Sequence, residues 1–262
     1  MDIEIKVHLN YQVPQPCMVL MQLEAADLAQ QRILDRRLEL AGNPQIHRLE
    51  AGDGVGERIW LQADGRFDCS YRANVAVSRP TVDLTKVQAT PLQHLPAPVI
   101  RYLLPSRYCP INEFDGLSLP DFGNHQGGAL IDAMARWICE NFTYDIGASD
   151  ATTTAQQSFL QRRGVCRDYA HVLISLARAI GIPARYASVY SPDVDPMDFH
   201  AVVEVFLDNA WHMVDPTGMS QPQRTAVVGV GRDATDVAFL TSFGDMHLVS
   251  QRVDVRLVDS QS

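Results

Sequence analysis

The segment HAVVEVFLDNAWHMVDPTG, residues 200–218, restricts the fold of this chain more than any other. In residues 200–207 the side chains alternate between two faces, as they do in a β-strand. Asp208 and Asn209 follow as a pair typical of a two-residue type I′ turn, and a second strand comes after them. The segment therefore predicts an antiparallel β-hairpin whose register is set by its turn.

This register brings a histidine and a carboxylate together. With Asp208 and Asn209 as the whole loop, Val202 lies opposite Asp215. Asp215 is then diagonal to His200 on the same face, with Cα atoms about 7–8 Å apart. A shift of one residue would turn Asp215 to the opposite face. The sequence therefore predicts that Asp215 fixes the tautomer of His200 and stabilises its imidazolium.

A cysteine begins the helix predicted over residues 166–180. The apolar stripe of this helix recurs at helical spacing and consists of Tyr169, Leu173, Leu176 and Ile180. A cysteine within an apolar helix is most often a packing residue. At the first turn, however, unpaired backbone N–H groups and the helix dipole favour the thiolate and lower the pKa of a cysteine. We therefore predict that Cys166 is a nucleophile, served by His200 and Asp215.

The other candidate residues form no comparable group. His171 lies off the apolar stripe of the 166–180 helix, where either packing or solvent would surround it. An acidic loop before His200 contains Asp193, Asp195 and Asp198. This loop lacks the glycine and the distal glutamate of a calcium-binding loop, so a solvated loop is favoured over one that binds a cation or a basic substrate. The five cysteines show no CxxC spacing, and the sequence predicts neither a metal nor a cofactor.

Periodicity along the rest of the chain predicts an α+β fold. The segments IEIKVHLNYQV and CSYRANVAV alternate with period two, as antiparallel strands do. Seven prolines between Ser78 and Pro120 indicate a connector, and helical periodicity begins after it. We predict a β-rich, sandwich-like N-terminal domain over residues 1–110. Residues 111–262 are predicted to form a second domain, in which helices pack on an antiparallel sheet.

Composition excludes several classes of partner. The chain has 262 residues and a formal net charge of −9, with no cluster of lysine and arginine for nucleic acid or anionic lipid. No apolar run approaches the length of a membrane span. The first residues, MDIEIKVHLN, alternate like a strand and do not resemble a signal peptide. We therefore expect a cytoplasmic protein that binds neither nucleic acid nor membranes.

The segments GVCRDYAHVLISLARAIGIPARY, DFHAVVEVF and WHMVDPTG resemble the transglutaminase-like superfamily, whose core is a papain-like fold. More narrowly, the chain resembles bacterial members regarded as cysteine proteases, which carry an N-terminal β domain. The resemblance covers nearly the whole chain and is most specific in residues 164–217. By motif position it implies Cys166 as nucleophile, His200 as histidine and Asp215 as aspartate. The sequence departs from the family at Val202, where an aromatic residue, mostly tryptophan, is usual.

These observations predict an acyl-transfer enzyme that acts on an amide of a peptide or protein. Its thioester intermediate would be resolved by water, as in a peptidase or amidase, or by an amine, as in a transglutaminase. We favour water, because the resemblance is to the protease-like branch. The Cys166 N–H is expected to be one oxyanion donor, with the second near Asn141 or Tyr144. The alternative is a non-catalytic module that retains the fold to bind peptides.

Overall fold

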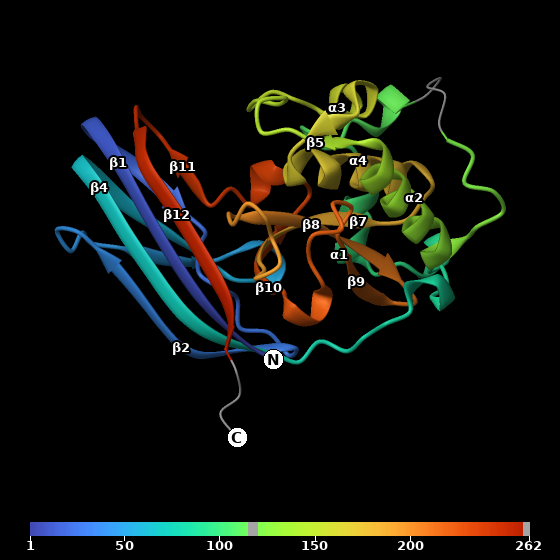
Figure 1. Cartoon of the computed structure of the whole chain (residues 1–262), viewed down its shortest axis with the longest axis horizontal. Coiled ribbons are helices and arrows are strands. Elements are labelled where there is room, and N and C mark those ends of the chain that lie inside the picture. The colour runs from blue at the N-terminus through green and yellow to red at the C-terminus, as the bar shows by residue number, and fades with distance from the viewer. Residues whose placement is uncertain (115–119, 259–262) are drawn as a thin grey trace.

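The computed structural model of the chain describes residues 1–114 and 120–258 and has an α+β fold. A large antiparallel sheet forms one side of the molecule (Figure 1). A smaller antiparallel sheet, covered by helices, forms the other side. The predicted fold class is therefore confirmed, with a β-rich N-terminal part followed by helices packed on an antiparallel sheet.

The large sheet takes its strands from both ends of the chain. They are β1 (Asp2–Met21), β2 (Gln31–Leu40), β3 (His47–Glu50), β4 (Glu57–Val77), β11 (Leu240–Ser242) and β12 (His247–Val258). β1 pairs with β4 along one side and with β11 and β12 along the other. Every second residue of β1 from Ile3 to Leu9 is buried, as the alternating sequence predicts.

The C-terminal strand β12 completes the sheet that the sequence assigned to residues 1–110. Val7 lies opposite Val253 in the register of β1 and β12, and both Val253 and Val255 are buried in the core of the large sheet. Without β12, much of β1 would present an open edge of unpaired backbone groups. The predicted division into residues 1–110 and 111–262 does not account for this return, because pairing between the two ends of a chain leaves no local sequence signal.

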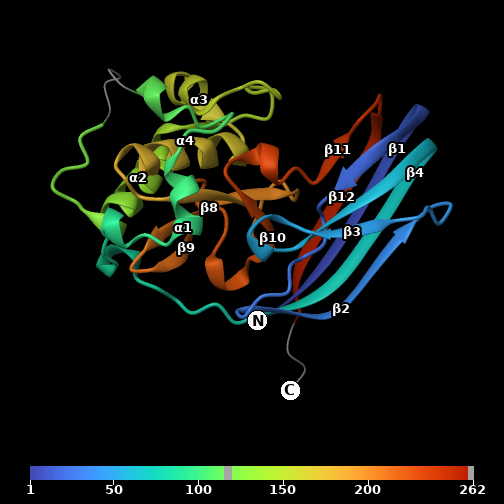
Figure 2. The same ribbon diagram turned by 180° about the vertical axis from the view of Figure 1, so that it is seen from behind.

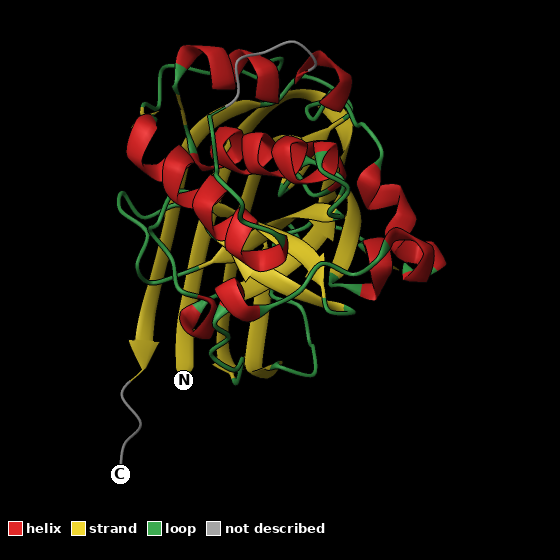
Figure 3. Cartoon of the chain, turned by 90° about the vertical axis from the view of Figure 1, so that its right-hand side faces the viewer, coloured by secondary structure: helices red, strands yellow, loops and turns green. Residues whose placement is uncertain are grey.

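The smaller sheet has the strand order β10-β7-β8-β9. Its strands are β7 (Ala184–Tyr190), β8 (His200–Leu207), β9 (Ala210–Val214) and β10 (Ala226–Gly231). The helices are α1 (Ala97–Ile100), α2 (Gly127–Asn141), α3 (Ala155–Gln161) and α4 (Cys166–Ala179), and they gather over this sheet in Figure 3. A short parallel pair, β5 (Thr143–Tyr144) and β6 (Arg163–Gly164), precedes α4. Within the described residues, no helix combines the length and apolarity that a membrane span needs.

Helix α4 lies at the centre of this part of the molecule. Its bounds agree with the helix predicted over residues 166–180. It packs on β7 and β8 on one side and on α2 and α3 on the other, so every residue from Asp168 to Arg178 is buried. The apolar stripe of the sequence accounts for the burial of only one face of this helix. The remaining faces are buried because other elements cover them. There the Ser175 hydroxyl and the Arg178 guanidinium donate to backbone carbonyls, and Nε2 of His171 accepts from the Ala234 N–H.

The two sheets share one interior at β10 (Figure 2). The buried Gln31 side chain donates to the Val227 carbonyl at 2.8 Å and accepts from the Val227 N–H at 2.6 Å. The Ala26 N–H also donates to the Val227 carbonyl, and the Tyr190 hydroxyl donates to the Leu23 carbonyl at 2.7 Å. Because these bonds satisfy backbone groups across the junction, the large sheet is fixed against the smaller one.

A buried arginine fixes the proline-rich connector. Arg178 is 3 % exposed, and its guanidinium donates only to uncharged oxygens of four of the described residues. These are the carbonyls of Leu104, Ala184 and Arg232 and the hydroxyl of Ser106. Arg178 thus ties the connector to the start of β7 and to the turn after β10. Its charge is stabilised by convergent dipoles.

A substitution that removes two buried methyl groups from β12 tests whether this strand packs in the core of the large sheet. We expect Val253→Ala to lower the free energy of unfolding by about 1–3 kcal/mol, since Val253 is buried against β1. Val249→Ala is the matched control, because Val249 lies on the same strand but is 64 % exposed, and it should change stability by less than about 0.5 kcal/mol. Equal effects in urea denaturation would contradict the proposed packing of β12.

Candidate active site

Cys166 is the first residue of α4 and follows a tightly held turn. The Asp168 carboxylate is fully buried and accepts hydrogen bonds from the Val165 N–H at 2.8 Å and the Ser149 hydroxyl at 2.6 Å. Gly164 packs directly against this carboxylate, and a Cβ at position 164 would lie 2.6 Å from the Asp168 side chain. The glycine before the cysteine is therefore required by this close approach. Asp168 is a positioning residue that the sequence analysis did not identify.

His200 and Asp215 meet as the hairpin register predicts. Val203 pairs with Val214, and Asp208 and Asn209 have φ values of 46° and 59°, which are typical of a type I′ turn. His200 begins β8, and Asp215 directly follows β9. Their side chains are joined by a 2.8 Å contact between Nε2 of His200 and Oδ2 of Asp215.

The Asp215 carboxylate is held by two further residues. Thr217 donates to Oδ1 through its N–H at 2.9 Å and its hydroxyl at 2.7 Å. Ser220 donates to Oδ2 through its N–H at 2.8 Å and its hydroxyl at 2.6 Å. Burial raises the pKa of Asp215, but the bonds from His200, Ser220 and Thr217 outweigh it and hold the pKa below its usual value. The sequence analysis missed Thr217 and Ser220, although the turn-forming segment DPTGMS was a local signal for them.

His200 is 2 % exposed and favours the protonated imidazole. Burial lowers the pKa of His200, but the hydrogen bond to Asp215 and the neighbouring Cys166 outweigh it and raise the pKa to about 10. The other ring nitrogen, Nδ1, is buried and forms no hydrogen bond with a described residue. Nε2 is therefore fixed by the carboxylate, which leaves Nδ1 for exchange of a proton.

Tyr144 lies beside the cysteine, whereas Asn141 does not. β5 pairs with β6 so that Tyr144 faces Gly164, and the Tyr144 ring packs 6.0 Å from that of Tyr169. The Tyr144 hydroxyl lies close enough to Cys166 for the backbone N–H and the side chain of the cysteine to influence the pKa of the phenol. Burial and then the charge of Cys166 raise the pKa of Tyr144, so the hydroxyl keeps its proton and can donate. Asn141 is exposed and donates to the Trp137 carbonyl of its own helix.

A pocket of about 560 Å³ opens beside these residues, and Cys166 and His200 both belong to its wall. Four aromatic residues contribute to the lining, namely Tyr108, Tyr186, Phe199 and Phe239. The rings of Phe199 and Phe239 are stacked, with centroids 4.2 Å apart. Both of these rings also pack against the core of the large sheet, so the N-terminal part of the chain supports the pocket. A pocket of this size accommodates a few residues of a peptide.

His171 is a packing residue behind this pocket. Its ring is 0 % exposed, stacks on Tyr108 with centroids 5.1 Å apart, and accepts from the Ala234 N–H at 3.1 Å. Burial lowers the pKa of His171 to about 3, so the ring is neutral at neutral pH. Of the two surroundings expected from the sequence, packing and solvent, the structure has the first. His171 fixes two pocket-lining residues, Tyr108 and Ala234.

The link between Asp215 and His200 can be tested by titration. We expect Asp215→Asn to lower the pKa of His200 substantially from about 10, because the substitution removes the negative charge that stabilises the imidazolium. The measurement is an NMR pH titration of the His200 ring signals. Asp193→Asn is the control, since Asp193 pairs with Arg224. An unchanged His200 pKa in Asp215→Asn would show that the carboxylate does not act on the ring.

Comparison with known proteins points to the same part of the chain as the site. The model of the transglutaminase-like superfamily matches residues 123–216, which include Cys166, His200 and Asp215. A crystal structure from Cytophaga hutchinsonii, described as a "Putative Cysteine Protease", superposes with a TM-score of 0.93. It is 30 % identical, and the match covers 100 % of this chain and 92 % of that one.

Curated relatives come from mycobacteria. An uncharacterized protein of Mycobacterium leprae is 32 % identical over 146 residues, which are 52 % of this chain and 52 % of that protein. An uncharacterized protein of Mycobacterium tuberculosis is 33 % identical over 119 residues, which are 40 % of this chain and 38 % of that protein. The matches thus span about half or less of the length of these relatives. From the family model and the full-length structural match, we conclude that the chain belongs to the transglutaminase-like superfamily.

Proposed function

We propose that this protein is a cysteine-dependent acyl-transfer enzyme that cleaves an amide or peptide bond through a thioester. Cys166 is the nucleophile, His200 transfers the proton, and Asp215 orients His200. Superfamily membership supports a cysteine-dependent enzyme in general. The observation that carries the specific proposal is the shared pocket wall of Cys166 and His200, with His200 bonded to Asp215 at 2.8 Å.

In this mechanism the Cys166 proton already resides on Nδ1 of His200 before the attack, as a thiolate–imidazolium pair, and the thiolate attacks the amide carbonyl carbon. A C–S bond forms as the carbonyl π pair moves onto oxygen. The oxyanion then accepts hydrogen bonds from the Cys166 N–H and the Tyr144 hydroxyl. As the C–N bond breaks, the imidazolium gives its proton to the departing amine. His200 then takes a proton from water, the resulting hydroxide attacks the thioester, and the carboxylic acid and the Cys166 thiolate are released.

Water is proposed as the acceptor because the structurally similar Cytophaga protein is described as a protease. A transglutaminase-type transfer to an amine would use the same three residues and differ only in the acceptor. A non-catalytic peptide-binding module is the remaining alternative. It is disfavoured by the four hydrogen bonds from Thr217 and Ser220, which hold an Asp215 carboxylate that peptide binding alone would not require. The cytoplasmic location expected from the sequence stays a prediction.

Selective alkylation tests the nucleophile. We expect iodoacetamide at neutral pH to modify Cys166 at least tenfold faster than Cys139, because a neighbouring imidazolium favours the reactive thiolate. Cys139 is an internal control, since it is exposed and belongs to the same chain. His200→Asn should remove most of this difference, and Cys166→Ala should abolish modification of its peptide in mass spectrometry. Equal rates at Cys166 and Cys139 would contradict the proposed function.

A second test concerns the oxyanion donor. p-Nitrophenyl acetate acylates a thiolate through an oxyanion, whereas iodoacetamide alkylates it without one. We expect Tyr144→Phe to slow the burst of p-nitrophenolate roughly 100-fold, while the rate of alkylation of Cys166 by iodoacetamide changes less than about twofold. Tyr186→Phe is the matched control, because Tyr186 lines the pocket together with Cys166 and carries a buried hydroxyl that forms no hydrogen bond with Cys166. A slower burst in Tyr186→Phe alone would assign the donor to Tyr186.

A further inference from the structure

The pocket beside Cys166 differs in charge from the chain as a whole. The chain has a formal net charge of −9. Among the residues that line the pocket, two are arginines, Arg107 and Arg167, and none is aspartate or glutamate. Low-dielectric walls focus the field of charges that line a cleft. An anion is therefore attracted to the nucleophile of an otherwise acidic protein.

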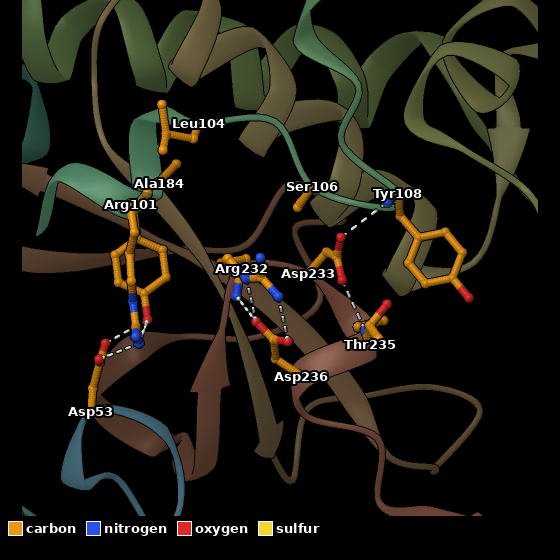
Figure 4. A network of polar contacts seen from close by, with 12 residues as sticks. Asp53, Arg101, Leu104, Ser106, Tyr108, Ala184, Arg232, Asp233, Thr235 and Asp236 are labelled. Atoms are coloured by element: carbon orange, nitrogen blue, oxygen red, sulfur yellow. Dashed lines mark hydrogen bonds and ion pairs between the residues drawn. The ribbon is translucent and has the colours of Figure 1, made fainter. Parts of the chain in front are cut away.

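Arg107 supplies a charge that no carboxylate of the described residues pairs with. Its guanidinium lies over the Tyr108 ring, 5.1 Å from the ring centroid, and no carboxylate within residues 1–114 and 120–258 forms an ion pair with it. Its neighbour Tyr108 is held in place, because the Tyr108 N–H donates to the buried Asp233 at 2.9 Å (Figure 4). The Tyr108 hydroxyl donates to the Ala151 carbonyl at 2.7 Å. The backbone that carries Arg107 is therefore fixed at the pocket rim.

Arg167 supplies a second charge, next to Cys166 in α4. Its guanidinium donates to the Asp150 carbonyl at 2.7 Å and to the Ser149 hydroxyl at 3.3 Å. Its Nε is 3.6 Å from the buried Asp168 carboxylate, which offsets part of the charge. Arg107 is thus the stronger and Arg167 the weaker attraction for an anion.

The acidic loop does not oppose this field from within the pocket. Asp193 pairs with Arg224 at 2.9 Å. Asp198 accepts a hydrogen bond from Gln251 at 2.6 Å, and its charge helps to raise the pKa of Tyr144. None of the three aspartates of the loop lines the pocket. The basic substrate considered from the sequence therefore has no recognition group there.

We propose that the pocket selects an acyl donor that carries a carboxylate, recognised by Arg107 with the help of Arg167. This inference rests on the proposed function, because it assigns the substrate class of the same site. An anionic group near the susceptible amide gains charge-assisted hydrogen bonds from a guanidinium, which is well matched to a carboxylate. The carboxylate belongs either to an acidic side chain or to the carboxyl terminus of a short peptide.

Iodoacetate and iodoacetamide provide a matched pair of probes, since they have the same leaving group and nearly the same size but differ by one negative charge. The quantity to compare is the ratio of the alkylation rates by iodoacetate and iodoacetamide, measured at pH 7.5 and low salt by mass spectrometry. We expect this ratio to be at least threefold higher at Cys166 than at Cys139 of the same molecule. It should fall toward the Cys139 value in 0.5 M salt.

Variants assign the effect to the arginines rather than to the imidazolium of His200, which is unchanged in all of them. Arg107→Gln should lower the ratio at Cys166 about threefold, and Arg167→Gln by less. Arg136→Gln is the control, because it removes one exposed arginine and changes the net charge equally. A ratio unchanged in Arg107→Gln would overturn the proposal. If neither reagent distinguishes Cys166 from Cys139, the proposed function fails as well.

Peptides then distinguish the two sources of the carboxylate. The measurement is protection of Cys166 from iodoacetamide by Ac-Ala-Ala-Glu-Ala-Ala-NH2, by its glutamine analogue, and by the glutamine analogue with a free carboxyl terminus. Stronger protection by the first peptide identifies an acidic side chain, and stronger protection by the third identifies a carboxyl terminus. Equal protection by all three, or best protection by the uncharged peptide, would contradict the proposal.

Discussion

The site depends on one hydrogen bond, between the His200 imidazole and the Asp215 carboxylate. These residues are fifteen positions apart and meet only because the hairpin of β8 and β9 turns through two residues. A change of one residue in that turn would move Asp215 to the other face of its strand. The bond stabilises the protonated ring, which is the partner that the proposed nucleophile at the start of α4 requires. Backbone register is therefore the physical basis of the proposed chemistry.

The surroundings of the site are fixed by buried polar groups rather than by apolar packing alone. Arg178 ties the connector to β7, Asp233 holds the backbone of Tyr108 and Thr235, and His171 accepts from Ala234. Each group satisfies backbone atoms of the connector, of the short 3-10 turn at Ala234–Asp236 or of the start of β7. Loops that line a pocket need such partners, because their unpaired N–H and C=O groups would otherwise be costly to bury.

The large N-terminal sheet contributes to the same pocket. Phe199 and Phe239 line the pocket and also pack on the core of the sheet. Gln31 and Tyr190 satisfy polar groups across the junction between the sheets. Beyond the site residues in sequence, the chain crosses this junction again and adds β12 to the large sheet. The two parts therefore act as one framework, and the sheet supports the shape of the pocket from behind.

Much of this arrangement can be predicted from short stretches of the sequence. The bounds of α4, the turn at Asp208 and Asn209, and the alternation of β1 follow from helical spacing, turn chemistry and period-two burial, which neighbouring residues determine. The positions of Cys166, His200 and Asp215 on their elements follow from the same signals. The burial of every α4 residue from Asp168 to Arg178 and the support of the Cys166 turn by Asp168 had weaker signals or none.

The sequence by itself determined the elements and which face of each carries the reactive side chains, because register and helical phase are properties of a short stretch of chain. Only the tertiary structure decided what those faces meet. The return of β12 to β1, the stacking of His171 on Tyr108 and the placement of Arg107 in the same pocket as Cys166 all bring together residues far apart in sequence. Such contacts depend on the packing of whole elements, and no local pattern encodes which of the many compatible partners is adjacent.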